Sequence, residues 1–315
     1  MIHTHLISPR ISAALCVVLL TLVVALLAHG GTGSSGMTFL KLGVSGRSVA
    51  MGDAMAASVS GAGATHYNPA GLLPREGAGN AELLFMHKEW IQDTRTEFLG
   101  ARVSVSDPVA LGFSVNTTTV SDIELRTRPG PAEGTFTSRY LALGISGAYR
   151  VSGTVSAGIT ARFLYEKILV DDASGIGIDL GIQYVTPLEG LSFGATVANI
   201  GSMGDLRTAP SRLPTLMRAG GAYAFAIAAL NGELLLAADG LYIFPESRPL
   251  LNAGVELDVE GIFMVRAGYQ AGSEGRGLSL GGGIRHGIFA LDYAFSRLNG
   301  ELGNGHTISL GVFLQ

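Results

Sequence analysis

The chain has 315 residues and a net charge of −4, from 21 basic and 25 acidic side chains. Only 15% of the residues are charged, against about 25% in an ordinary soluble domain, and the mean hydropathy is +0.38. Without a basic excess, the composition argues against nucleic-acid binding. The single cysteine, Cys16, lies near the N-terminus, so residues beyond it form no intrachain disulfide and no thiolate metal site.

Residues 1–30 predict a signal peptide. Arg10 provides a short positive start, residues 11–28 form an apolar stretch, and Ala28 and Gly30 are small residues ahead of a predicted cleavage after Gly30. An uncleaved membrane anchor is the alternative, because an apolar stretch of this length can span a bilayer. Either interpretation predicts an exported or membrane protein.

Residues 31–77 have a different character from the rest of the chain. They are rich in Gly, Ala and Ser and show no regular alternation, and residues 48–58 are expected to form a short helix. The segment ends in a turn motif, where Pro69 fixes its own φ angle and favours an extended conformation for Asn68. A rigid turn that aims the chain at the first barrel strand is one interpretation of this motif. The other is contact with a ligand or partner, through His66, Tyr67, Asn68, Pro69, Ala70 and Gly71.

Residues 78–315 alternate between apolar and polar side chains. In 155–165, for example, Val155, Ile159 and Phe163 share one face, and Thr160 and Arg162 lie on the other. A period of two indicates β-strands with one apolar and one polar face. Fourteen such strands are predicted, at 80–91, 95–106, 109–125, 134–150, 153–170, 175–186, 190–200, 213–226, 231–244, 249–259, 262–271, 277–286, 287–297 and 305–315.

The even strand number, the strand length and the short connections favour an all-β, transmembrane, antiparallel, up-and-down β-barrel. The polar face carries mainly Gly, Ser, Thr and Asn, whereas a soluble sandwich or propeller, the alternative fold, exposes more charge. Aromatic residues near strand ends resemble the girdle of a membrane barrel. They are Tyr165, Tyr184, Tyr242, Phe244 and Phe295.

The same alternation places eight charged side chains on the lumen face. Their mixed signs favour a network of ion pairs, because an unpaired charge in a narrow lumen is costly. A polar path for a substrate is the alternative. The eight residues are Arg102, Arg162, Asp179, Asp239, Glu256, Arg266, Arg285 and Asp292.

Several motifs resemble the PorV/PorQ family of outer-membrane proteins, which is related to the FadL-type transporters. The N-terminal motifs are the most specific, and the resemblance covers nearly the whole chain after residue 30. The motifs are 39–44 (FLKLGV), 46–48 (GRS), 50–52 (AMG), 67–72 (YNPAGL), 197–201 (VANIG), 213–220 (LPTLMRAG) and 305–311 (GHTISLG).

This resemblance implies a barrel of about fourteen strands, formed by residues 78–315, with an N-terminal plug or hatch formed by residues 31–77. It implies the outer membrane of a Gram-negative bacterium as the location and membrane lipid as one partner. Its PorV/PorQ side implies binding or shuttling of exported proteins with C-terminal sorting domains, in type IX secretion or surface attachment. Its FadL side implies transport of hydrophobic small molecules, and a purely structural barrel is a third possibility.

No enzyme is predicted. The sequence offers no set of nucleophile, base and orienting residue for catalysis. Its histidines beyond residue 30 are scattered, without a pair at metal-ligand spacing. We therefore expect no catalytic residue, no metal and no cofactor.

Overall fold

The computed structural model describes residues 35–74, 79–91, 94–273, 275–298 and 303–314. The predicted signal peptide, residues 1–30, lies outside this part of the chain. Among the described residues, no helix is both long enough and apolar enough to cross a membrane.

Fourteen strands of the described chain form a closed antiparallel barrel, in which each strand pairs with its neighbours along the chain and the last pairs with the first. The predicted fold class and strand number are therefore confirmed. The strands are β1 (Ala81–Glu89), β2 (Thr94–Ser106), β3 (Val109–Leu125), β4 (Gly134–Arg150), β5 (Val155–Ile168), β6 (Asp171–Val185), β7 (Leu191–Met203), β10 (Leu216–Ile227), β11 (Gly232–Ile243), β12 (Arg248–Val259), β13 (Phe263–Ala271), β14 (Arg276–His286), β15 (Phe289–Leu298) and β16 (Asn304–Leu314).

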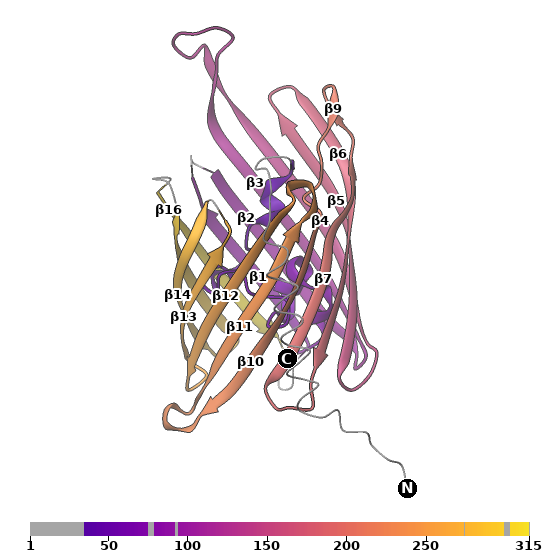
Figure 1. Ribbon diagram of the computed structural model, residues 1–315, viewed down its shortest axis with the longest axis vertical. Coiled ribbons are helices and arrows are strands. Elements are labelled where there is room, and N and C mark those ends of the chain that lie inside the picture. The colour runs from indigo at the N-terminus through magenta and orange to yellow at the C-terminus, as the bar shows by residue number, and fades with distance from the viewer. Residues whose placement is uncertain (1–34, 75–78, 92–93, 274, 299–302, 315) are drawn as a thin grey trace.

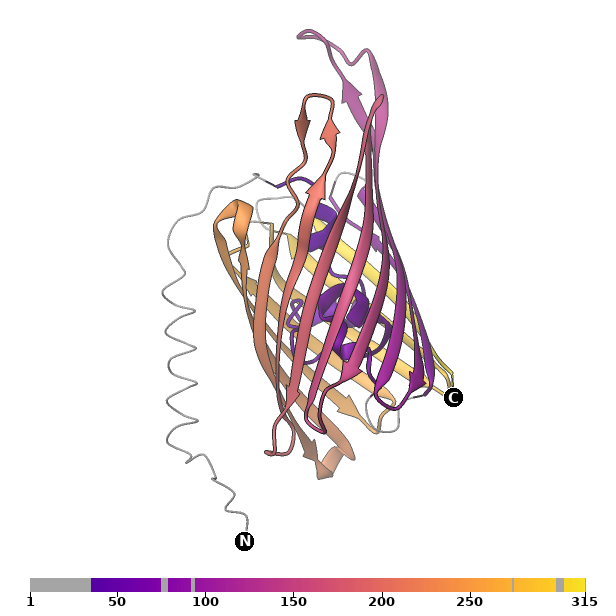
Figure 2. The same cartoon turned by 90° about the vertical axis from the view of Figure 1, so that its right-hand side faces the viewer.

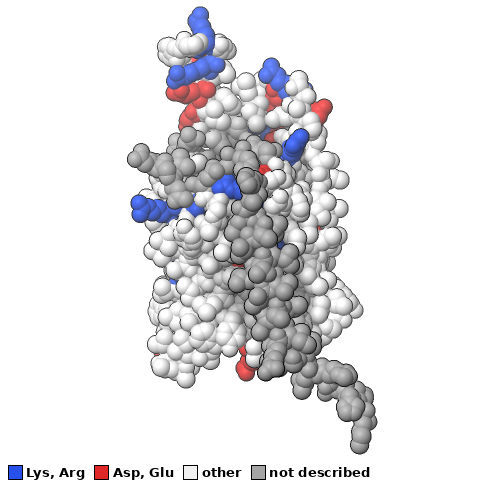
Figure 3. Space-filling view, in the orientation of Figure 1, with Lys and Arg blue, Asp and Glu red and all other residues white. Residues whose placement is uncertain are grey.

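The alternation of the sequence decides which side chains face the lumen. On β5, Ile159 is 49% exposed on the outer wall, while its neighbour Thr160 is fully buried inside. Successive side chains of a strand point to opposite faces of the sheet, so the apolar set lies outside and the polar set inside. The charged side chains visible in Figure 3 gather at the upper end of the molecule, and the wall below them carries few.

The two ends of the barrel differ. At the lower end of Figures 1 and 2, short turns such as 107–108 and 287–288 join the strands. At the upper end, the long hairpin formed by β3 and β4 extends beyond the other strands. The connection between β7 and β10 lies at the same end and contains two short paired strands, β8 (Asp205–Leu206) and β9 (Ala209–Pro210).

Residues 35–74, here called the inner segment, lie inside the barrel (Figure 2). Most of their side chains are buried. The inner segment consists of η1 (Thr38–Lys41), α2 (Gly46–Ala50), η2 (Gly61–Gly63), α3 (Ala64–Tyr67) and η3 (Pro69–Leu72). Two short 3-10 turns belong to the connections of the barrel, η4 (Ala228–Leu230) and η5 (Phe244–Glu246).

The helix expected over residues 48–58 is wrong in its extent. Helix α2 begins after Ser45, whose side chain accepts a hydrogen bond from the backbone N–H of Ser48, and it ends at Ala50. Gly52 and Asp53 have φ angles of +63° and +58°. A right-handed helix cannot continue through two left-handed residues, so the chain turns away there.

Glycines of the barrel wall allow the inner segment to approach the backbone of the strands. A Cβ atom at Gly158 of β5 would lie 2.4 Å from the carbonyl carbon of Pro69, and one at Gly254 of β12 would lie 2.4 Å from the carbonyl oxygen of Met51. Any larger residue would force wall and segment apart, because such distances are far below van der Waals contact. Equally close contacts are made at Gly181, Gly194, Gly268 and Gly281.

Candidate functional site

Described residues line two cavities in the lumen, one on each side of the inner segment. The upper cavity has a volume of about 690 Å³ and lies towards the end with the long hairpin. The lower cavity has a volume of about 730 Å³ and is lined by residues near the short turns, such as Gly287 and Ile288. Both volumes are in the range of small-molecule binding pockets.

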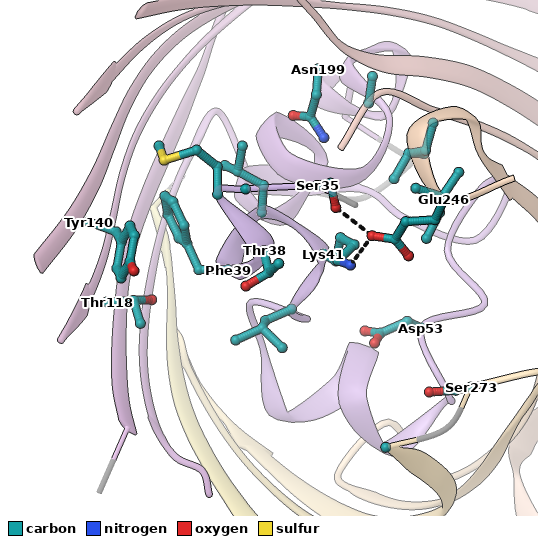
Figure 4. A pocket seen from close by; sticks show the side chains of 18 of the residues that line it. Ser35, Thr38, Phe39, Lys41, Asp53, Thr118, Tyr140, Asn199, Glu246 and Ser273 are labelled. Atoms are coloured by element: carbon teal, nitrogen blue, oxygen red, sulfur yellow. Dashed lines mark hydrogen bonds and ion pairs between the residues drawn. The ribbon is translucent and has the colours of Figure 1, made fainter. Parts of the chain in front are cut away.

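Part of the upper cavity is apolar and aromatic. Phe39, from η1, faces Tyr140 of β4 with ring centroids 5.8 Å apart (Figure 4). Leu40 and Leu42 also line the cavity, as does Trp90, which follows β1 and is the only tryptophan of the chain. Such a surface suits an apolar or aromatic molecule, because burying apolar area is favourable and aromatic rings offer additional contact geometry.

A cluster of polar side chains lies on the opposite side of this cavity, between the inner segment and η5. The Lys41 ammonium donates a hydrogen bond of 2.5 Å to the Glu246 carboxylate, which also accepts one from the Ser35 hydroxyl (Figure 4). Burial raises the pKa of Glu246, but these two hydrogen bonds outweigh that effect and hold it below its ordinary value. The carboxylate therefore fixes the start of the inner segment to the barrel rim at neutral pH.

The floor of the upper cavity centres on Asp53. Its carboxylate accepts hydrogen bonds from the Tyr67 hydroxyl, at 2.5 Å, and from the Arg276 guanidinium, at 2.8 Å. The guanidinium of Arg218 lies 5.2 Å from the centre of the Tyr67 ring. Burial and the neighbouring Asp53 charge raise the pKa of Tyr67 well above its ordinary value, so the phenol stays protonated.

The predicted turn motif lies in the interior of the molecule. Asn68 is fully buried, and its side-chain amide donates to the carbonyl oxygens of Ala56, at 2.8 Å, and Ile182, at 3.0 Å. Its side-chain oxygen accepts from the backbone N–H of Ala70 and thereby starts η3. The motif thus attaches the inner segment to strand β6. The remaining residues Pro69 and Gly71 are also buried.

His66 faces the upper cavity from α3. Its ring lies 4.9 Å from the Tyr67 ring, and its Nδ1 atom is buried and has no hydrogen-bond partner among the described residues. Burial lowers the pKa of His66 well below its ordinary value, and the positive charges of Arg162 and Arg218 lower it further. The imidazole is therefore neutral at physiological pH.

The eight charged residues predicted for the lumen all face it, and most are paired. Arg162 contacts Asp179 at 2.5 Å within the wall, and Arg162 also donates to the carbonyl oxygen of Thr65 in the inner segment. Asp239 pairs with Arg218 at 3.4 Å. Asp239 also accepts hydrogen bonds from the backbone N–H groups of Met55 and Ala56. These pairs therefore hold the inner segment as well as the wall.

The lower cavity contains the second group of charges. Arg266 contacts Glu256 at 2.5 Å and Asp292 at 2.7 Å, and Arg47 of α2 contacts Glu256 at 2.8 Å. Arg102 lies 3.8 Å from Glu82, and the Arg285 guanidinium lies 4.8 Å from the centre of the Phe313 ring. No group of three His, Cys, Asp or Glu side chains within the described ranges is arranged to hold a metal ion.

Several important residues of the site were missed from the sequence. Lys88 of β1 is fully buried and donates to the carbonyl oxygen of Gly43 at 2.7 Å. It shares the inward face with Leu84 and Met86. Because this face of β1 carries both apolar and charged side chains, the sequence shows no alternation there that would mark Lys88 as inward-facing. Lys41 lies within the 39–44 motif, but nothing in that motif indicates its contact with Glu246. Asp53, Glu246 and Arg276 lie outside the predicted strands, and no sequence signal marks them.

The closed barrel of fourteen strands, with the inner segment in its lumen, is similar to several solved structures. The toluene transporter TodX of Pseudomonas putida matches this structure with a TM-score of 0.61 and 13% identity, over 91% of this chain and 98% of that chain. The toluene transporter TbuX of Ralstonia pickettii matches with a TM-score of 0.58 and 15% identity, over 87% and 99%. A FadL homologue of Pseudomonas aeruginosa matches with a TM-score of 0.50 and 13% identity, over 86% and 98%.

The protein thus has the fold of the FadL-type barrels, and this part of the sequence resemblance is confirmed at the level of the fold. No protein-family model matches the chain, and no curated protein sequence does either. At such low identity the likeness concerns the architecture alone.

Proposed function

We propose that the protein is a non-catalytic barrel in the outer membrane of a Gram-negative bacterium, where it transports hydrophobic small molecules that bind in the upper cavity. The observation that carries the proposal is the aromatic and aliphatic surface of that cavity, formed by Phe39, Leu40, Trp90 and Tyr140. The similarity of the fold to TodX and TbuX, which are toluene transporters, supports it. The proposal favours the FadL side of the sequence resemblance over its PorV/PorQ side.

The outer wall supports a position in the membrane. Large apolar side chains are exposed there on strands around the barrel, including Phe163 of β5 at 46%, Leu180 of β6 at 49% and Leu291 of β15 at 49%. A soluble protein rarely exposes apolar surface over so many adjacent strands. A closed barrel also satisfies all backbone hydrogen bonds of its strands within the sheet, as the interior of a bilayer requires.

Trp90 provides a direct test, because the only tryptophan of the chain lies in the proposed binding cavity. The purified barrel, in a detergent without aromatic groups, is titrated with toluene, with a medium-chain fatty acid and with glucose as a polar control. We expect a saturable change in Trp90 emission with one of the two apolar ligands and none with glucose. A flat emission with both apolar ligands argues against the proposed cavity.

A second candidate function is the docking of exported proteins, as the PorV/PorQ resemblance implies. The long β3–β4 hairpin favours it, because it extends beyond the rim and carries charges of both signs at its tip (Figure 3). Arg126 pairs there with Glu124, and Arg128 lies 3.7 Å from Glu133. Stoichiometric recovery of exported proteins that share a C-terminal domain, lost when residues 122–136 are replaced by a tight turn, would support this role.

A further inference from the structure

Tyr67 separates the two cavities of the lumen. Among the described residues that line either cavity, it is the one that lines both. At several other places the inner segment meets the wall through backbone packed on glycines, as at Gly158 and Gly254. A backbone contact of this kind opens only if the whole segment moves, whereas a side chain moves by rotation about its own bonds. The thinnest point of the partition is therefore the Tyr67 side chain.

Polar groups lie on both sides of the Tyr67 hydroxyl. Above it, the hydroxyl donates to Asp53, which lines the upper cavity. On the other side, the Ser48 side chain, which is hydrogen-bonded to Ser45, lines the lower cavity. The backbone N–H of Val44 also donates to the Tyr67 oxygen, at 3.3 Å. The boundary between the cavities is thus polar at this point.

The closed position of Tyr67 is stabilised by the residues around its hydroxyl group. Asp53, its acceptor, is fixed by Arg276 at 2.8 Å and by Gln270 at 3.3 Å. Gly43 packs directly against this pair, since a Cβ atom there would lie 2.2 Å from the Asp53 carboxylate and 2.8 Å from the Tyr67 hydroxyl. The hydroxyl is therefore confined as long as its hydrogen bond to Asp53 is made.

We propose that the barrel has a second, polar route, in which water and small polar solutes cross the inner segment when Tyr67 leaves Asp53. The structure shows the closed state. The charged lining of the lower cavity, with Arg47, Glu256 and Arg266, suits hydrated solutes. Apolar molecules gain no favourable contact there and stay in the upper cavity. This route is independent of the proposed transport of hydrophobic molecules.

Conductance of single barrels in planar lipid bilayers tests the route. The wild-type barrel is expected to be closed for most of the recording. Tyr67→Ala removes the partition and is expected to give a steady open current. Tyr67→Phe keeps the ring and loses the hydrogen bond to the Asp53 carboxylate, so the open fraction is expected to rise by roughly ten-fold or more.

Phe313→Ala is the matched control, because it removes an aromatic ring from the lower cavity alone and is expected to leave the closed state unchanged. Heat-modifiable mobility on gels shows which variants have assembled, and Tyr67→Phe keeps the test valid if Tyr67→Ala does not fold. A closed state unchanged in every assembled Tyr67 variant would overturn the proposal. So would a wild-type barrel that is open throughout. The recordings contain no hydrophobic ligand. Failure of this proposal would therefore leave the proposed binding of hydrophobic molecules in the upper cavity unaffected.

Discussion

The side chain of Asn68 joins the inner segment to the barrel wall through the backbone of Ile182, whose carbonyl oxygen lies 3.0 Å from the donating amide nitrogen. The same nitrogen donates to Ala56, so one amide group links two parts of the inner segment to β6. On the wall, Gly181 makes room for this contact, because a Cβ atom there would lie 2.0 Å from the Asn68 side-chain oxygen. The turn motif is therefore a structural attachment in addition to a reversal of the chain.

Replacement of Asn68 by alanine should loosen the inner segment while the barrel itself remains. The buried carbonyl oxygens of Ala56 and Ile182 lose a donor, at a cost of about 1–3 kcal/mol. Limited proteolysis should cleave the inner segment of the variant faster than that of the wild type. Asn304→Ala, at an exposed position of β16, is the control. Equal cleavage rates in Asn68→Ala and the control would contradict this role of the amide.

Gly158→Ala should separate the turn motif from strand β5. The added methyl group would lie 2.4 Å from the carbonyl carbon of Pro69 and 2.5 Å from the nitrogen of Ala70, and overpacking of this kind costs about 1–3 kcal/mol. The temperature at which the barrel loses its heat-modifiable gel mobility is expected to fall. Gly134→Ala, where a Cβ atom meets no described atom within 4 Å, should leave that temperature unchanged.

Stability should depend on pH through His66. Its pKa is lowered in the folded protein by burial and by the charges of Arg162 and Arg218, so the unfolded chain binds a proton more readily. The stability that the neutral His66 imidazole contributes to the folded protein is fully present above the ordinary histidine pKa of about 6.5. It is lost progressively as the pH falls below that value. Unfolding of the wild type and of His66→Phe is compared between pH 7.5 and 5. A difference between the two that stays constant over this range would refute the prediction.

Tyr140→Ala should weaken the binding of aromatic ligands in the upper cavity. The ring of Tyr140 lies beside that of Phe39 in the wall of the cavity, and loss of one aromatic contact costs about 1 kcal/mol, or roughly a five-fold rise in Kd. Tyr140→Phe keeps the ring and should bind as the wild type does. Titration of Trp90 fluorescence with toluene measures both, and equal affinities in the alanine and phenylalanine variants would exclude Tyr140 as part of the site.

The predicted and observed strands agree to within a few residues for most of the barrel. The β3 and β4 ranges, 109–125 and 134–150, are identical to the prediction, and Phe163 and Arg162 lie on the predicted outer and inner faces. The reason is local, since neighbouring side chains of a strand point to opposite sides and a wall between lipid and lumen imposes opposite polarity on them. Among the strands of the described residues, only β8 and β9, in a connection without alternation, were not predicted.

The inner segment shows what a local pattern cannot decide. Its helix ends at Ala50 because the chain must turn at Gly52 and Asp53, and its short turns are stabilised mainly by contacts with the wall. Tertiary contacts regularly override propensity in segments as short as these. The sequence resemblance pointed to the turn motif, but not to its attachment on β6.

The sequence alone thus determined the barrel, its strand number and the eight charges of its inner face, because each depends on a period of two along one strand. Only the tertiary structure decided the pairing of those charges, the division of the lumen at Tyr67 and the cluster of Lys41, Glu246 and Ser35. These features join residues far apart in the chain, such as Ser35 and Glu246, which are separated by 211 positions. Contacts across such separations leave no periodic trace in the sequence, since closing the barrel is what brings their partners together.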